Sequence, residues 1–297
     1  MSLADIHVHL DGSLRPDTLE EFAREDGADV PRDILFEPHM GLARALSCFG
    51  FTLDRLTHPA RVARVADEMC QDATAHGVTT LEIRFAPQLH GGRAADFIDA
   101  AIEGSAGRAG VILCALYGEP PDVLEHLVEL ARSRPGVVGI DLAGGPVPGH
   151  EFGMHAYVPA FSRAARLGIG RTVHAGEGRP PEEIRTAIVD LQAQRIGHGT
   201  TLLDDPGLVD LILERDIVIE ACPTSNLHTG AIPTLEQHPL GTWLAMGIRA
   251  CINTDNTLFS DTDATVEHQR AGTLRGMSPA LLDRAIAHGH AAAFPRR

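Results

Sequence analysis

Val137-Val-Gly-Ile-Asp-Leu142 and Gly170-Arg-Thr-Val-His174 are two short, mostly apolar runs separated by a helical pattern. Short β-branched runs that alternate with helical patterns are typical of repeated βα units around a parallel sheet. Outward from this pair the same rhythm gives eight candidate strands, which are Leu3–His9, Thr79–Ala86, Val111–Tyr117, Val137–Leu142, Gly170–His174, Arg195–His198, Ile217–Ala221 and Arg249–Thr254. We therefore expect an α/β fold, a (β/α)8 TIM barrel.

The segment between the first two candidate strands is much longer than a single crossover. From Arg15 to His76 it carries several helical patterns, so we expect extra helices inserted after strand 1. An insert at this point lies on the face formed by the carboxyl ends of the strands, where it can cover a site; an additional packing layer is the other interpretation. The sequence has no low-complexity linker and no internal repeat, so we expect residues 1–297 to form a single domain.

The composition excludes several classes of partner. A formal net charge of -15 repels nucleic acid and the anionic face of a membrane. Charged residues interrupt the apolar stretches well short of the roughly 18 residues that a membrane span needs, and no secretory leader pattern is present. The five cysteines are scattered, without Cys-x-x-Cys spacing, and are interpreted as reduced and buried. We expect a cytoplasmic protein that binds a small molecule; the oligomeric state stays open.

Two histidines end the first candidate strand. His7 and His9 are two residues apart, and residues i and i+2 of a strand point to the same face. Two neutral imidazoles directed at one point suit a divalent metal. Alone this spacing is a weak indication, and it gains weight only if other ligands end other strands.

Three further metal-competent residues end other candidate strands, namely His174, His198 and Asp255. Each alone also fits a structural role, as a capping aspartate or a hydrogen-bonded histidine. Together with His7 and His9 they converge at the carboxyl ends of the strands, where barrel active sites are built. Imidazoles and a carboxylate with open coordination positions fit a catalytic Zn²⁺, which lowers the pKa of water to near neutrality and implies hydrolysis.

In the motifs around these residues, the sequence resembles the adenosine deaminase family within the amidohydrolase superfamily. The similar motifs run in family order from residue 5 to about residue 260, and as a set they are highly specific. They are His7-Val-His-Leu-Asp-Gly-Ser13, Asp141-Leu-Ala-Gly144, His174-Ala-Gly-Glu177, Ile196-Gly-His198-Gly199, Cys222-Pro-Thr-Ser-Asn226 and Asn253-Thr-Asp255.

The resemblance implies roles for the matched residues in catalysis. It implies four ligands of one Zn²⁺, which are His7, His9, His174 and Asp255. His198 and Asp255 would orient or deprotonate the attacking water. Glu177 would deliver a proton to N1 of the purine as C6 becomes tetrahedral, a task for a carboxyl group whose pKa is raised by a dry pocket. A helix N-terminal acid is the other interpretation of Glu177.

The resemblance also implies substrate contacts. The backbone N–H of Gly144 would meet purine N3, and Asp11 would accept a hydrogen bond from the ribose 5′-hydroxyl, although an aspartate before a glycine also fits a turn. Adenine-specific relatives tend to carry Glu where Asp11 stands, so this residue favours a nucleoside. Asn256 follows Asp255 where the family has paired aspartates, and its amide can donate to purine N7 at any pH.

Two further departures from the family border the substrate. Gly145-Pro146 stands where many members have an acidic pair, and the covering helix, which usually carries bulky aromatic residues, is trimmed around Ala45. The apolar residues left there are Leu42, Leu46 and Phe49. We therefore expect a pocket that is wider than adenosine requires.

These observations predict zinc-dependent hydrolytic deamination of an aminopurine nucleoside, with adenosine or 2′-deoxyadenosine as the first choice. The nearest alternative is the same chemistry on a modified nucleoside, such as aminodeoxyfutalosine or another 5′-substituted adenosine. A catalytically inactive relative that only binds nucleosides is a further alternative. A cytidine-type zinc deaminase is excluded, because its His-x-Glu and Pro-Cys-x-x-Cys motifs do not occur.

Overall fold

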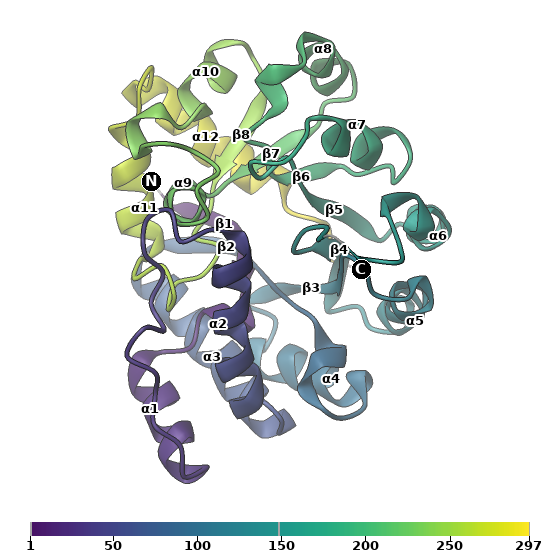
Figure 1. Ribbon diagram of the computed structural model, residues 1–297, viewed down its shortest axis with the longest axis vertical. Coiled ribbons are helices and arrows are strands. Elements are labelled where there is room, and N and C mark those ends of the chain that lie inside the picture. The colour runs from purple at the N-terminus through teal and green to yellow at the C-terminus, as the bar shows by residue number, and fades with distance from the viewer. Residues whose placement is uncertain (1, 148, 297) are drawn as a thin grey trace.

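Eight parallel strands pair in chain order in the computed structural model, which describes residues 2–147 and 149–296 (Figure 1). They are β1 (Leu3–His9), β2 (Val78–Phe85), β3 (Ala109–Leu116), β4 (Val137–Ala143), β5 (Gly170–Ala175), β6 (Arg195–His198), β7 (Val218–Ala221) and β8 (Arg249–Ile252). Each predicted strand is present within a few residues of its expected bounds, and the predicted TIM-barrel architecture is confirmed.

The α-helices alternate with these strands and surround them in Figure 1. They are α1 (Pro16–Glu25), α2 (Leu42–Arg55), α3 (Pro59–Ala75), α4 (Ala94–Ser105), α5 (Pro121–Arg132), α6 (Val158–Arg166), α7 (Glu182–Val189), α8 (Pro206–Glu214), α9 (Pro223–His228), α10 (Leu240–Ala245), α11 (Ala264–Gly272) and α12 (Pro279–Ala292). Several begin on a proline, whose fixed φ suits the first turn of a helix. Proline lacks an N–H, but an N–H in the first turn would have no acceptor within the helix.

The predicted insertion after strand 1 consists of α1 and α2, since α3 is the crossover helix that packs on β2 and α4. Helix α2 packs against the 3₁₀ turn Leu10–Gly12, which directly follows β1 at the carboxyl end of the barrel. The α2 side chains that line the pocket below it are Leu42, Ala45, Leu46 and Phe49. The insertion therefore covers the carboxyl face of the barrel, as expected from its place in the sequence.

The barrel closes between β8 and β1 through residues that follow β8. The N–H of Ile6 donates to Asn253 Oδ1 at 3.0 Å, and the N–H of His9 donates to the carbonyl of Asp255 at 2.7 Å. Asp255 itself donates its N–H to the carbonyl of His7 at 2.9 Å. The candidate strand Arg249–Thr254 was too long, since β8 ends at Ile252 and Asp255 lies in the loop beyond it. This loop is nevertheless held on β1 by two backbone hydrogen bonds.

The amino end of the barrel is closed by the chain after α12. The Phe294 ring lies so close to β5 that a Cβ atom on Gly170 would come within 2.3 Å of it. Glycine at this position therefore makes room for the ring, which also lies under the Arg195 guanidinium at 3.7 Å. Solvent is thus excluded from the barrel interior at its amino end. Among the described residues, no helix combines the length and the apolar character that crossing a membrane requires.

Candidate active site

Five metal-competent side chains meet at the carboxyl end of the barrel. Nitrogen atoms of His7, His174 and His198 and an oxygen of Asp255 all lie within 4.8 Å of one another. His9 joins them, because its Nε2 lies 3.2 Å from His174 Nε2 and 3.4 Å from Asp255 Oδ1. The structure therefore brings together every residue that the sequence nominated for a metal or for water activation, in a buried cluster that fits a metal site.

Two of these imidazoles are held from behind by carboxylates. His7 Nδ1 lies 2.7 Å from Glu220 Oε2, and His174 Nδ1 lies 3.1 Å from Asp141 Oδ2. An ionised carboxylate only accepts hydrogen bonds, so each Nδ1 carries a proton, and in the neutral ring each Nε2 presents a lone pair. His7 Nε2 is buried and without a hydrogen-bond partner. Such an orphaned acceptor, facing a carboxylate and other imidazoles, fits a metal ligand.

A buried arginine links the two supporting carboxylates. Arg84 donates from Nη1 to Asp141 at 2.8 Å and from Nη2 to Glu220 at 2.9 Å. Burial opposes the charge of Glu220, but Arg84 and Arg195 outweigh it and hold the pKa of that carboxyl group well below its usual range. The carboxylates therefore remain ionised and keep their imidazole partners oriented.

The sequence alone indicates no functional role for Arg84 or Glu220, and it places Asp141 only within one of the family motifs. A signal was available, because Arg84 and Glu220 stand inside apolar strand runs where an unpaired charge would be very costly. Their partners could not be inferred, because the charges that neutralise them come from other strands.

His198 and Asp255 both adopt backbone conformations that are uncommon for residues with side chains. His198 has φ +66° and Asp255 has φ +63°, in the left-handed region. The surrounding strands and hydrogen bonds must hold them there, and such strained positions cluster at functional sites. His198 Nδ1 lies 2.9 Å from the side-chain amide of Asn226, so its support differs from that of His7 and His174.

Glu177 lines the same small pocket as the cluster. Its carboxyl group is buried, with one oxygen 3.8 Å from His198 Nε2. Burial raises the pKa of Glu177 to about 7, and the nearby charge of Asp255 adds to the shift. The group can therefore hold a proton near neutral pH, as a general acid must.

Asp11 and Asn256 adjoin each other beneath α2. Both are buried, and each has one side-chain oxygen without a hydrogen-bond partner. A Cβ on Gly12 would lie 2.0 Å from Asn256 Oδ1, so the glycine after Asp11 is what allows Asn256 to occupy its position. Buried polar atoms without partners are rare, and both residues line a hollow beneath α2.

Gly144 and Gly145 form the opposite wall. Gly144, at φ +72°, accepts a hydrogen bond on its carbonyl from Arg179 Nη1 at 3.2 Å. A Cβ on Gly145 would lie only 2.2 Å from the same guanidinium. The guanidinium of Arg179 therefore fills the space that a side chain at position 145 would need. This packing explains why the acidic pair expected from the family pattern cannot be accommodated here.

Two connected hollows lie beneath α2. The inner one, about 50 Å³, is lined by the metal-competent cluster together with Glu177, Asn256 and Gly144. The outer one, about 410 Å³, shares His9, Leu46, Phe49 and Gly144 with it and is lined by Asp11 and by mostly apolar side chains. The expectation of a spacious pocket therefore applies to the outer hollow, whereas the inner one is tight.

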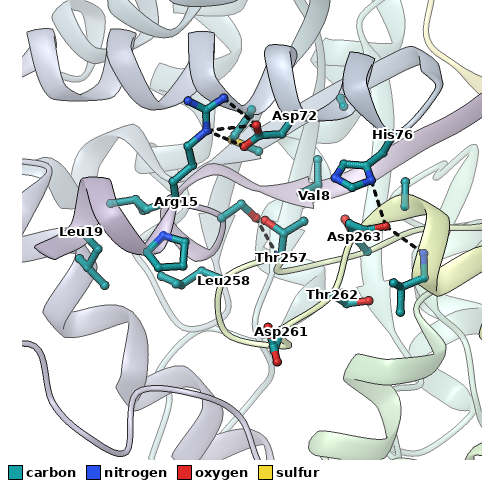
Figure 2. Close-up of a pocket in the computed structure, with 18 of the residues that line it drawn as sticks. Val8, Arg15, Leu19, Asp72, His76, Thr257, Leu258, Asp261, Thr262 and Asp263 are labelled. Carbon is teal, nitrogen blue, oxygen red and sulfur yellow. Dashed lines mark hydrogen bonds and ion pairs between the residues drawn. The ribbon is translucent and has the colours of Figure 1, made fainter.

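A larger cavity, of about 670 Å³, lies elsewhere, between α1, α3 and the chain that leads into α11 (Figure 2). Figure 2 shows Arg15 directed at Asp72 and His76 directed at Asp263, while Asp261 stands apart. Arg15 Nη2 lies 2.6 Å from Asp72 Oδ1, and His76 Nδ1 lies 3.4 Å from Asp263 Oδ1. None of the predicted metal ligands is among its described lining residues. The chemistry of the lining, rather than the volume, therefore locates the candidate site.

Comparisons with known proteins show which family the chain resembles. The family model for adenosine deaminase matches residues 2–296. The adenosine deaminase of Serratia proteamaculans is 35% identical over 318 aligned residues, covering 99% of this chain and 94% of that protein. A zinc-bound cog1816 amidohydrolase of Burkholderia ambifaria has a TM-score of 0.87 at 25% identity, covering 99% and 86% of the two chains.

A plant protein has a similar structure. Arabidopsis ADAL complexed with IMP has a TM-score of 0.88 at 25% identity, covering 99% of this chain and 92% of that one. The structural likeness extends over the whole barrel, and the sequence match extends over the motifs that form the buried cluster. The chain therefore belongs to the adenosine deaminase family.

Proposed function

We propose that the protein hydrolyses the 6-amino group of an aminopurine nucleoside, with adenosine or 2′-deoxyadenosine as the first substrate, and releases the 6-oxo product and ammonia. One observation carries this proposal. A carboxyl group that keeps its proton near pH 7, Glu177, faces a cluster of imidazoles and a carboxylate across one buried pocket. Hydrolysis at a ring carbon next to a basic nitrogen needs such a proton donor opposite the group that activates water.

We assign the cluster to one Zn²⁺ per chain, with His7, His9, His174 and Asp255 as its ligands. Support comes from the orphaned Nε2 of His7, from the carboxylates behind His7 and His174, and from the zinc found in the Burkholderia ambifaria neighbour. Zinc, when bound, supplies the lowered pKa of water that allows attack at neutral pH. Five buried free cysteines also fit a reducing compartment, so we propose a cytoplasmic location.

The residues of the chain divide the remaining tasks. Asp255 accepts the proton that the attacking water loses, while His198 holds the oxygen that adds to C6. Glu177 passes its proton to N1, which relieves the negative charge that attack drives into the ring. Asn256 donates to N7, the Gly144 N–H donates to N3, and Asp11 accepts from the 5′-hydroxyl. The orphaned oxygen of Asp11 supports its assignment as a substrate contact, and the place of Asn256 in the lining of the inner hollow supports the other.

The outer hollow favours a second candidate, an adenosine with an uncharged 5′-substituent. This hollow begins at Asp11, where the 5′-end of the nucleoside would lie, and no Lys or Arg is among its described lining residues. The nearest guanidinium, Arg179, has its three nitrogens engaged by Glu183, Gly144 and His174. A 5′-phosphate would therefore meet a carboxylate without a compensating cation, in contrast to the IMP of the Arabidopsis complex.

Ammonia release from a panel of purines tests both candidates. The panel contains adenine, adenosine, 2′-deoxyadenosine, 5′-deoxyadenosine, 5′-alkylthioadenosines, aminodeoxyfutalosine, AMP and N6-methyl-AMP, and zinc content is measured on the same preparation. We expect turnover of adenosine or an uncharged 5′-analogue and very little turnover of the nucleotides. Preference for AMP would contradict the assignment of the outer hollow. Binding of nucleosides without ammonia release, by a protein with full zinc, would contradict the enzymatic proposal.

A further inference from the structure

We propose that two residues behind the pocket, Asn226 and His238, fix the proton of His198 on Nε2, so that His198 donates a hydrogen bond to the attacking water and does not remove its proton. Neither Asn226 nor His238 lines the inner pocket or its outer extension. They act through His198 and are therefore positioning residues. The identity of the oxygen that receives the hydrogen bond rests on the function proposed above, whereas the proton placement rests on the relay itself.

The relay starts at a backbone amide. The N–H of Leu240 donates to His238 Nδ1 at 3.1 Å. A backbone N–H can only donate, so Nδ1 of His238 is the acceptor, and the proton of the neutral ring must be on Nε2. His238 is almost fully buried, and this burial lowers its pKa to about 3, which keeps the ring neutral.

The second step orients an amide. His238 Nε2 lies 3.2 Å from Asn226 Oδ1, and its proton is donated to that oxygen. Because Asn226 Oδ1 accepts this hydrogen bond, the NH₂ group of Asn226 is the end of the amide that faces His198 Nδ1, at 2.9 Å. An amide NH₂ has no acceptor capacity, so Nδ1 of His198 must accept and the ring proton must be on Nε2. The direction of every hydrogen bond follows from the backbone of Leu240.

The same barrel contains the opposite arrangement twice. Behind His7 and His174 the Nδ1 partner is a carboxylate, which requires Nδ1 to be protonated and leaves Nε2 as a lone pair. Behind His198 the partner is an amide, and Nε2 becomes a donor. A carboxylate partner therefore leaves His7 and His174 able to bind a metal, whereas an amide partner makes His198 a hydrogen-bond donor. The three rings differ in this way although one nitrogen of each lies within 4.8 Å of the others and of an Asp255 oxygen.

This placement divides the work between His198 and Asp255. A neutral imidazole whose Nε2 is protonated cannot take a proton at that nitrogen. Its N–H can hold the attacking water and stabilise the oxygen as it adds to C6 and gains charge. The water proton then passes to Asp255, which is left as the only one of the two with a free acceptor. Removing one such donor from a developing oxyanion costs about 10²–10³-fold in kcat.

The test is Asn226→Asp, which keeps the size of the side chain but replaces the donor by an acceptor. The ring proton of His198 should move to Nδ1, as in His7 and His174. We expect kcat for adenosine to fall by about 10²–10³-fold, with zinc content retained and a smaller change in KM. Histidine-selective ¹⁵N spectra of the zinc-loaded protein report which ring nitrogen is protonated, and the signals that disappear in His198→Gln assign the ring.

A matched pair at position 238 tests the same relay without adding charge. His238→Gln can accept from the Leu240 N–H and donate to Asn226, so it should keep the His198 nitrogen pattern and most of kcat. His238→Phe retains a ring beside Trp243, which His238 contacts edge-on at 5.4 Å. It removes both hydrogen bonds, so the Asn226 amide is free to turn. We expect the Nδ1-protonated form of His198 to appear and kcat to fall in the Phe variant only.

A His198 ring protonated on Nδ1 in the unaltered protein would overturn the proposal. So would an Asn226→Asp protein whose His198 pattern and kcat are unchanged. If no nucleoside releases ammonia, the proposed function fails, but the nitrogen spectra still decide whether the relay sets the proton of His198.

Discussion

Two groups of charged side chains lie inside the same barrel, one above the other, and they differ in how their charges are balanced. In the lower group Arg195 is paired with Glu82 and Glu220, each at 2.6 Å, under the cover of Phe294. In the upper group the imidazoles around Asp255 face one another, and Asp11 Oδ1 and His7 Nε2 are buried without a hydrogen-bond partner. Arg195 Nη2 in the lower group also lacks a hydrogen-bond partner, but its guanidinium lies beside two carboxylates. Burial is nearly complete in both, so burial alone does not mark a site.

The difference teaches that the balance of buried charge separates structural from functional residues. A buried charge is tolerated when its counter-charges are in place, and the lower group meets this condition within the chain. In the proposed function, a metal and a substrate supply the partners that the upper group lacks. Glu220 belongs to both groups, because one of its oxygens binds Arg195 and the other binds His7. The structural layer therefore also orients a ligand of the site.

Among the substitutions that test this comparison, we expect the largest effect from Asp255→Ala, on zinc content and activity. This change removes the carboxylate that the imidazoles share, so the protein should lose its zinc and its deaminase activity together. Elemental analysis and ammonia release measure the two losses. Asp283→Ala, on the exposed face of α12, is the control and should alter neither. Full zinc in the Asp255→Ala protein would disprove the ligand assignment.

The next effect separates metal binding from proton transfer. Glu177→Gln keeps the size of the side chain but has no acidic proton, so kcat should fall by about 10²–10⁴-fold while zinc content is unchanged. Glu182→Gln, on an exposed position of α7, provides the matched control. Near-normal turnover of the Glu177→Gln protein would exclude this residue as the donor to N1.

In the lower group the expected effect is on stability. Arg195→Met leaves Glu82 buried without its cation and Glu220 with Arg84 alone. Breaking a buried pair in this way costs about 3–5 kcal/mol of the free energy of unfolding. Denaturant unfolding measures the loss. The control is Arg93→Ala, whose ion pair with Asp96 is exposed and screened by solvent, so that stability should barely change. Equal losses in the two variants would contradict the distinction between the layers.

A smaller effect is expected from Asn256→Ala. Leaving purine N7 without its donor costs about 1–3 kcal/mol, which corresponds to roughly 5–150-fold in kcat/KM. The unaltered enzyme should process 7-deazaadenosine poorly, whereas the variant should discriminate little between the two nucleosides. If the unaltered enzyme turned over both equally well, Asn256 would have no part in reading N7.

The smallest expected effect is a pH dependence. The pKa of Glu177 is raised to about 7, so the folded enzyme keeps this proton below pH 7. In mildly acidic buffer, loss of the Glu177 proton should therefore not lower kcat/KM. Above pH 7 it should fall tenfold per unit as the proton is lost. The residual activity of Glu177→Gln should lack this alkaline limb. A flat profile of the unaltered enzyme up to pH 9 would argue against the proton transfer.

Much of the fold and the cluster was predictable because strand ends are local features of the sequence. Alternating apolar runs and helical patterns gave eight strands, and parallel strands in a barrel bring their carboxyl ends to one face. Residues such as His9, His174 and Asp255 therefore had to converge once the strands were recognised. Their number and residue types then indicated a metal. The end of β8 was placed too late, because the extended chain to Asp255 continues beyond the ladder as a bridge to β1.

The tertiary structure alone decided what stands behind each of these residues. Glu220 behind His7 is 213 residues away in the chain, and Gly12, near the opposite end of the chain, leaves space for Asn256. A side chain shows its type in the sequence, but its proton, its charge and its free lone pairs depend on partners contributed by other strands. For this reason the sequence determined which groups reach the site, while packing determined which of them can bind a metal and which donates a hydrogen bond.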